Sequence, residues 1–122
     1  RINIKSWSDW LRQMQDRHDY MMYRQDLAGF GEPQEGQWDG FQRINTDTKS
    51  GGIIGVFRQG GMENQRRIIV RYLDPLRMYK IYEAPGGLEL GSMSGKQMME
   101  EGFDAMLEQE YDGGFFEIRA TD

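Results

Sequence analysis

Apolar and polar residues alternate along most of the chain after residue 37, with the period of two that is typical of half-buried β-strands. The alternating runs are rich in β-branched and aromatic residues, which fit a pleated surface. The strands predicted in this way cover residues 38–45, 52–59, 66–72, 78–84, 88–92, 105–110 and 114–120. Short strands at this spacing predict an all-β domain whose sheets pack face to face as a sandwich.

Glycine-rich turns separate the predicted strands, at residues 47–52, 60–64, 85–87 and 112–114. Gly, Asn and Asp tolerate the positive φ angles that tight hairpins require. These connections are too short for the crossover helices of parallel strands, so we expect antiparallel sheets. The segment LDPLRMY at residues 73–79 is similar to the corner of an immunoglobulin-like sandwich, where a tyrosine hydroxyl bonds back to the upstream backbone. We therefore expect an immunoglobulin-like sandwich in which Tyr79 is structural.

A helix is predicted over residues 7–20, with Ser6 as its N-cap. Its apolar residues recur at i, i+3, i+4 and i+7 and form one stripe. The members of this stripe are Trp7, Trp10, Leu11 and Met14. A stripe with two tryptophans needs a surface to pack against, either in this domain or in a missing one, so it is a candidate interdomain face.

A second, very short helix is predicted inside LGSMSGKQMMEEGF, residues 90–103. Ser94 and Gln97 form a capping box, and Gly102 suits the left-handed residue that ends a helix. So short a helix is marginal in water unless tertiary packing stabilises it. We expect Met98, Met99 and Phe103 to close one end of the core.

The chain of 122 residues is long enough for one domain. We divide it into an N-terminal helical segment (1–24), an irregular connector (25–37) and the β-sandwich (38–122). The first segment is either the end of a missing barrel domain or a linker helix. Because the sequence begins at Arg1, we expect it to be a piece of a longer protein.

A net charge of −5 disfavours nucleic-acid binding, which needs a clustered excess of Lys and Arg. The absence of cysteine excludes disulfides and zinc sites of the cysteine type. No apolar run approaches the length of a membrane span, and no signal peptide is visible. These features leave the compartment open.

Candidate catalytic groups are sparse. His18 is the single histidine, and the sequence has no serine in a nucleophile-elbow motif that could pair with it as nucleophile and base. None of the 20 acidic residues stands out as the pair that glycoside hydrolysis needs. We therefore predict no catalytic, cofactor or metal site on this chain and expect that it is not itself an enzyme.

Sugar binding is the alternative that the residues support. Trp38, Asp39 and Arg43 are candidate sugar contacts on the first predicted strand, together with the ring of Phe41. Period two places Trp38 and Phe41 on opposite sides of that strand, which weakens a flat aromatic platform.

Several segments resemble the C-terminal β-sandwich of glycoside hydrolase family 36 α-galactosidases and related clan D enzymes. The segments are Trp38-Asp39-Gly40, IIGVFRQG (53–60), VRYLDPLRMYKI (70–81), LGSMSGKQMMEEGF (90–103) and EYDGGFFEI (110–118). The resemblance implies that a catalytic (β/α)8 barrel precedes the sandwich and carries both catalytic aspartates. It also implies that the first helix is the last barrel helix or a linker helix docked on the barrel.

The resemblance favours a noncatalytic accessory domain that supports the barrel of its own parent chain. An independent carbohydrate-binding module is the first alternative, and a protein-interaction sandwich is the second. The sugar, linkage and stereochemistry of the parent enzyme do not follow from these residues.

Overall fold

The computed structural model of the chain describes residues 4–27, 38–58, 64–107 and 113–121. Its helices are α1 (Ile4–His18) and α2 (Gly95–Glu100). Its strands are β1 (Gln25–Asp26), β2 (Trp38–Ile44), β3 (Gly51–Arg58), β4 (Gln65–Ile68), β5 (Met78–Glu83), β6 (Leu88–Ser94), β7 (Phe103–Met106) and β8 (Gly113–Ala120). The prediction of an all-β domain with an N-terminal helix and one short capped helix is confirmed.

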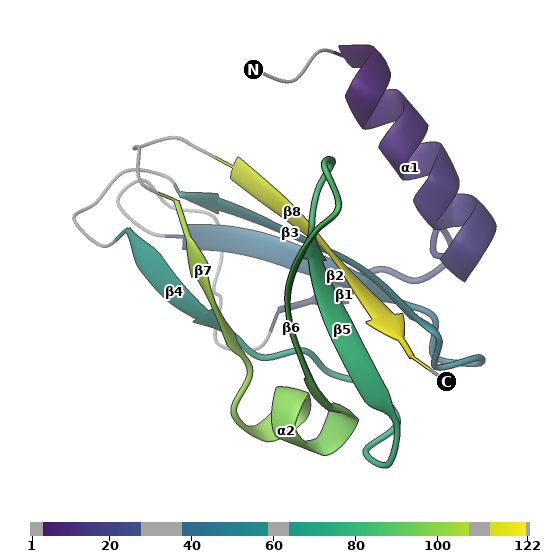
Figure 1. Cartoon of the computed structure of the whole chain (residues 1–122), viewed down its shortest axis with the longest axis vertical. Helices are drawn as coiled ribbons and strands as arrows, with labels where there is room; N and C mark the ends of the chain where they lie inside the picture. Colours follow the sequence, from purple (N-terminus) through teal and green to yellow (C-terminus); the bar gives the residue numbers. More distant parts are fainter. Residues whose placement is uncertain (1–3, 28–37, 59–63, 108–112, 122) are drawn as a thin grey trace.

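The strands form two sheets of very different size. The large sheet has the order β1-β2-β3-β8-β5-β6, the small one pairs β4 with β7, and every pairing is antiparallel. The last strand, β8, lies between β3 and β5 and pairs with both, so it joins the two groups of strands into one sheet. Figure 1 shows the β4–β7 pair and α1 on opposite sides of this sheet. The inner face is the one toward the small sheet, and the outer face is the one toward α1.

The main core lies between the inner face and the small sheet. Alternate residues of β3, such as Ile54 and Val56, point into it, whereas Ile53 belongs to the separate cluster under α1. The small sheet contributes Ile68, Phe103 and other buried residues to the same core. The period of two read from the sequence therefore sorts the residues of the central strand β3 between two buried layers.

The corner tyrosine takes its predicted place. Tyr79 is fully buried, and its hydroxyl donates to the carbonyl of Lys49 at 2.7 Å and accepts from the N–H of Asp74 at 3.0 Å. The hydroxyl thus satisfies two backbone groups upstream, as the sandwich-corner prediction requires.

The short helix α2 closes one end of the core. Ser94 Oγ accepts from the N–H of Gln97 at 3.0 Å, and Gly102 ends the helix with φ +75°. Met98 is fully buried in the core. A Cβ at Gly95 would lie 1.9 Å from the carbonyl oxygen of Asp74, so the first helical residue must be glycine.

The start and end of α1 differ from the prediction. The helix begins at Ile4, so Ser6 lies in its first turn and is not the N-cap. It ends at His18 because Asp19 adopts φ +50° and the Gln15 side chain accepts the N–H groups of Tyr20 and Met21, both at 3.1 Å. A glutamine side chain that folds back on the next turn of chain leaves no periodic signal in the sequence.

The predicted connector contains a strand that the pattern does not show. Gln25 and Asp26 pair with β2, and the rest of the connector from residue 28 to residue 37 lies outside the described residues. The buried Gln42 donates to the Gln25 side chain at 2.7 Å and to the carbonyl of Arg71 at 3.0 Å. A strand of two residues is too short for alternation to reveal.

Candidate functional site

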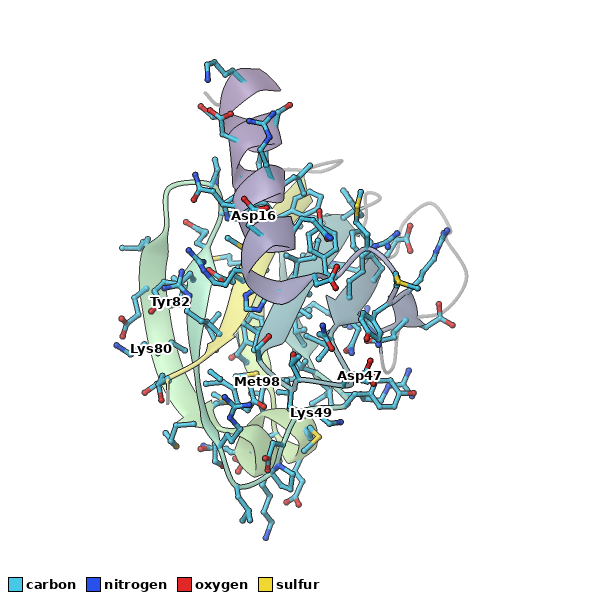
Figure 2. All side chains as sticks on the ribbon, turned by 90° about the vertical axis from the view of Figure 1, so that its right-hand side faces the viewer. Asp16, Asp47, Lys49, Lys80, Tyr82 and Met98 are labelled. Atoms are coloured by element: carbon cyan, nitrogen blue, oxygen red, sulfur yellow. The ribbon has the colours of Figure 1, made fainter. Side chains whose placement is uncertain are left out.

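The tryptophan stripe of α1 packs on the outer face of the chain's own large sheet. Trp10 is 5% exposed and Met14 is 2% exposed, and both belong to a cluster with Tyr20 and Ile53. Leu11, in contrast, is 37% exposed. Most of the stripe is therefore used within this domain, and Leu11 is left open. Figure 2 looks onto α1 where it crosses the sheet, and it labels Tyr82 and Lys80, which lie on strand β5.

Five rings form one aromatic cluster between α1 and the sheet. Its members are Trp7, Trp10, Phe41, Phe57 and Phe115. The Phe115 ring is central, with centroid distances of 5.1 Å to Trp7, 6.0 Å to Trp10, 6.1 Å to Phe41 and 5.8 Å to Phe57, all in edge-to-face geometry. Trp7 and the three phenylalanines are only half-buried. The aromatic cluster therefore packs α1 against the sheet, while part of its ring surface stays exposed to solvent.

An ionic cluster fastens the other end of α1. Its centre is Glu117 on the outer face of β8, which is 2% exposed. Arg17 Nη1 donates to both carboxylate oxygens at 2.8 and 2.7 Å, and His18 Nε2 lies 2.6 Å from Oε2. Arg119 donates from Nη2 at 2.7 Å and from Nε at 3.1 Å. One buried acid thus joins two residues of the helix to its own strand.

The charges in the ionic cluster hold Glu117 ionised. Burial by itself raises the pKa of this carboxyl, but hydrogen bonds from His18, Arg119 and Arg17 outweigh burial and lower the pKa to about 2. The same carboxylate raises the pKa of Arg119, against the effect of burial. Arg119 also stacks on the Tyr82 ring with its guanidinium carbon 4.3 Å from the centroid.

His18 also reaches the turn between β2 and β3, which Asp47 and Lys49 mark in Figure 2. Its Nδ1 lies 3.1 Å from Ser50 Oγ, so Ser50, His18 and Glu117 are connected in the order of a serine, histidine and acid relay. The imidazole side chain of His18 is 1% exposed, and the carboxylate of Glu117 accepts hydrogen bonds from the guanidinium groups of Arg17 and Arg119. The contacts of His18 therefore join the end of α1 to the β2–β3 turn and to β8.

The predicted sugar contacts are separated by the sheet. Trp38 is 3% exposed and belongs to the main core on the inner face. Asp39 and Arg43 lie half-buried on the outer face, where Arg43 donates to the carbonyl of Met21 at 2.9 Å and lies 6.0 Å from the Phe41 ring centroid. The structure does not bring Trp38 together with the other two residues.

Sequence reasoning missed Glu117 and Phe115 as partners of α1. The alternation in GFFEIRA places Phe115, Glu117 and Arg119 on one face of the last strand. An acid on the same strand face as an aromatic residue was the available signal, but the helix that covers this face lies about a hundred residues earlier in the chain.

The described residues contain no group of three His, Asp or Glu side chains placed to hold a metal ion. Within the same part of the chain, neither helix has the length and apolar character to cross a membrane.

No family model matches the chain, and no curated protein matches it. Among solved structures, it is similar to the galactosidase domain of an alpha-galactosidase-sucrose kinase, AgaSK, with a TM-score of 0.66 and 16% identity. The likeness covers 97% of this chain and 15% of that chain, so the present chain spans a small part of the length of the solved one. At this identity the likeness shows a shared fold, which includes nearly all of the residues described above.

Proposed function

We propose that this chain is a noncatalytic accessory β-sandwich of an α-galactosidase-like glycoside hydrolase, and that it supports a catalytic (β/α)8 barrel in the same longer protein. The observation that carries the proposal is the fold likeness to a galactosidase domain over 97% of this chain. The segments that resemble family 36 sandwiches lead independently, from the sequence, to the same class of protein.

The construction of the domain suits a supporting role. Aromatic and ionic clusters hold α1 at both ends, so the helix and the large sheet form a rigid unit. The partly open surface of α1 includes Leu11, and the half-buried Trp7 ring lies one turn before it. An apolar side chain that projects from a rigid helix is a suitable contact for a second domain.

The first test uses the gene and the isolated chain. We expect the coding region to contain a catalytic barrel before these residues, and we expect the isolated chain to leave p-nitrophenyl α-galactoside unhydrolysed. Hydrolysis by the isolated chain, or a coding region without any catalytic domain, would refute the proposal.

The second test compares Leu11→Asp with the matched control Asp16→Ala in the longer protein and in the isolated chain. Leu11→Asp places a charge on the open part of the stripe without emptying the core. We expect it to lower the unfolding temperature of the longer protein while leaving that of the isolated chain unchanged within experimental error. Equal effects of the two variants on the longer protein would argue against contact at this position.

A further inference from the structure

A groove lies between α1 and the turn that joins β5 to β6. It has a volume of about 300 Å³. Its lining residues are Ser6, Asp9, Trp10, Gln13, Pro85 and Gly86. The helical residues have the spacing i, i+3, i+4 and i+7, so a single face of α1 forms one wall and the hairpin turn forms the other.

The groove combines a small apolar edge, from the 5% exposed Trp10 and from Pro85, with polar groups at its rim. Trp10 is mostly packed into the aromatic cluster, with Trp7 and Phe115 centroids each 6.0 Å away, and its remaining edge meets the groove beside Pro85. The carboxylate of Asp9 and the carboxamide of Gln13 are one helical turn apart on the same face. A planar acceptor beside an amide that both donates and accepts is suited to a pair of neighbouring hydroxyl groups.

The charge of Asp9 is already paired within α1. Lys5 Nζ donates to Asp9 Oδ2 at 2.9 Å, and Arg12 Nη1 lies 3.5 Å from Oδ1. The carboxylate therefore already has two cationic partners, and its site does not favour a cationic ligand. Each carboxylate oxygen keeps lone pairs for a neutral donor.

From these features we infer that the groove binds one neutral pyranose unit, with the ring edge against Trp10 and Pro85 and hydroxyl groups toward Asp9 and Gln13. The volume lies at the lower end of the range of about 300–1,000 Å³ for small-molecule sites, which suits a single ring rather than a long chain. An open groove and few polar contacts give a dissociation constant on the order of millimolar. This inference stands on the groove alone and does not require the catalytic domain proposed above.

The experiment titrates the ¹⁵N-labelled chain with galactose, glucose and raffinose, up to about 100 mM, and follows amide and indole chemical shifts. Gly86→Phe is the blocking variant, because Gly86 lines the groove and a Cβ there meets no atom within 4 Å. Gly91→Phe is its matched control, since a Cβ there is equally unobstructed and Gly91 does not line the groove. Gln13→Ala removes one polar contact at an exposed position, and Asp16→Ala is its control.

The inference predicts saturable shifts at groove residues with at least one sugar. Gly86→Phe and Gln13→Ala each weaken binding about tenfold or more, whereas Gly91→Phe and Asp16→Ala leave it unchanged. Spectra of the free variants confirm that each one is folded. Shifts that stay linear with every sugar, or saturable binding that Gly86→Phe leaves intact, would overturn the inference and leave the proposed accessory function untouched.

Discussion

The ionic cluster makes a prediction about stability and pH that is specific to Glu117. Glu117→Gln keeps the shape of the side chain and removes its charge. The pKa of this carboxyl is about 2 in the folded chain, against an ordinary value of 4.5. At about 1.4 kcal/mol per pH unit, this difference corresponds to about 3 kcal/mol of stability at neutral pH. The side chains of Arg17 and Arg119 are each 37% exposed, and water screens part of their charge, so we expect a loss of about 2 kcal/mol.

The sign of the pH dependence follows from the lowered pKa. Between about pH 4.5 and pH 2 the unfolded chain binds the proton more readily than the folded chain, so acid favours unfolding. The stabilisation by Glu117 is therefore complete above pH 5 and fades as the pH falls toward 2. Glu117→Gln has no such proton to take up, and the difference in unfolding free energy between the two proteins shrinks across this window.

Urea unfolding followed by tryptophan fluorescence measures this difference at pH 7, 4.5, 3.5 and 2.5. Other acidic residues are common to both proteins and cancel in the comparison. Glu89→Gln is the matched control, because Glu89 pairs with Lys80 at 3.3 Å on the exposed surface, where such pairs contribute about 0–1 kcal/mol. A difference for Glu117→Gln that is no larger than that of the control, or that stays constant from pH 7 to pH 2.5, would refute the electrostatic reasoning.

Further substitutions test the sandwich corner and the helical plug, each by urea unfolding of the purified variant. Tyr79→Phe removes the hydroxyl that donates to the carbonyl of Lys49 and accepts from the N–H of Asp74, and it is expected to cost about 1–3 kcal/mol; a neutral result would contradict a structural role for the hydroxyl. Met98→Ala empties a fully buried site and should cost about 2–5 kcal/mol, whereas a loss below about 1 kcal/mol would mean that α2 does not close the core. Gly95→Ala forces a Cβ to within 1.9 Å of a carbonyl oxygen and should destabilise the chain far more than Gly91→Ala, where the space is open; similar losses for the two variants would show that this carbonyl can move aside.

Local physics explains what was predictable. Most strands of the sandwich were predicted because apolar and polar residues alternate along them, and alternation is a property of neighbouring residues. The short helix α2 was predicted because Ser94, Gln97 and Gly102 satisfy or terminate backbone groups within one or two turns. Tyr79 was assigned correctly because its hydroxyl bonds to the backbone at Asp74, only five residues away in the same corner.

The sequence by itself thus determined the type and approximate bounds of the elements and the side chains that cap them. Only the tertiary structure decided that six strands share one sheet, that α1 covers its outer face, and that Glu117 meets Arg17 and His18 there. The groove beside Gly86 is likewise a result of that packing. These contacts join residues 100 and 99 positions apart, and no local periodicity specifies such a pairing. They form because the tryptophan stripe of the helix and the three phenylalanines of the sheet face would both stay exposed to water unless the helix covered the sheet.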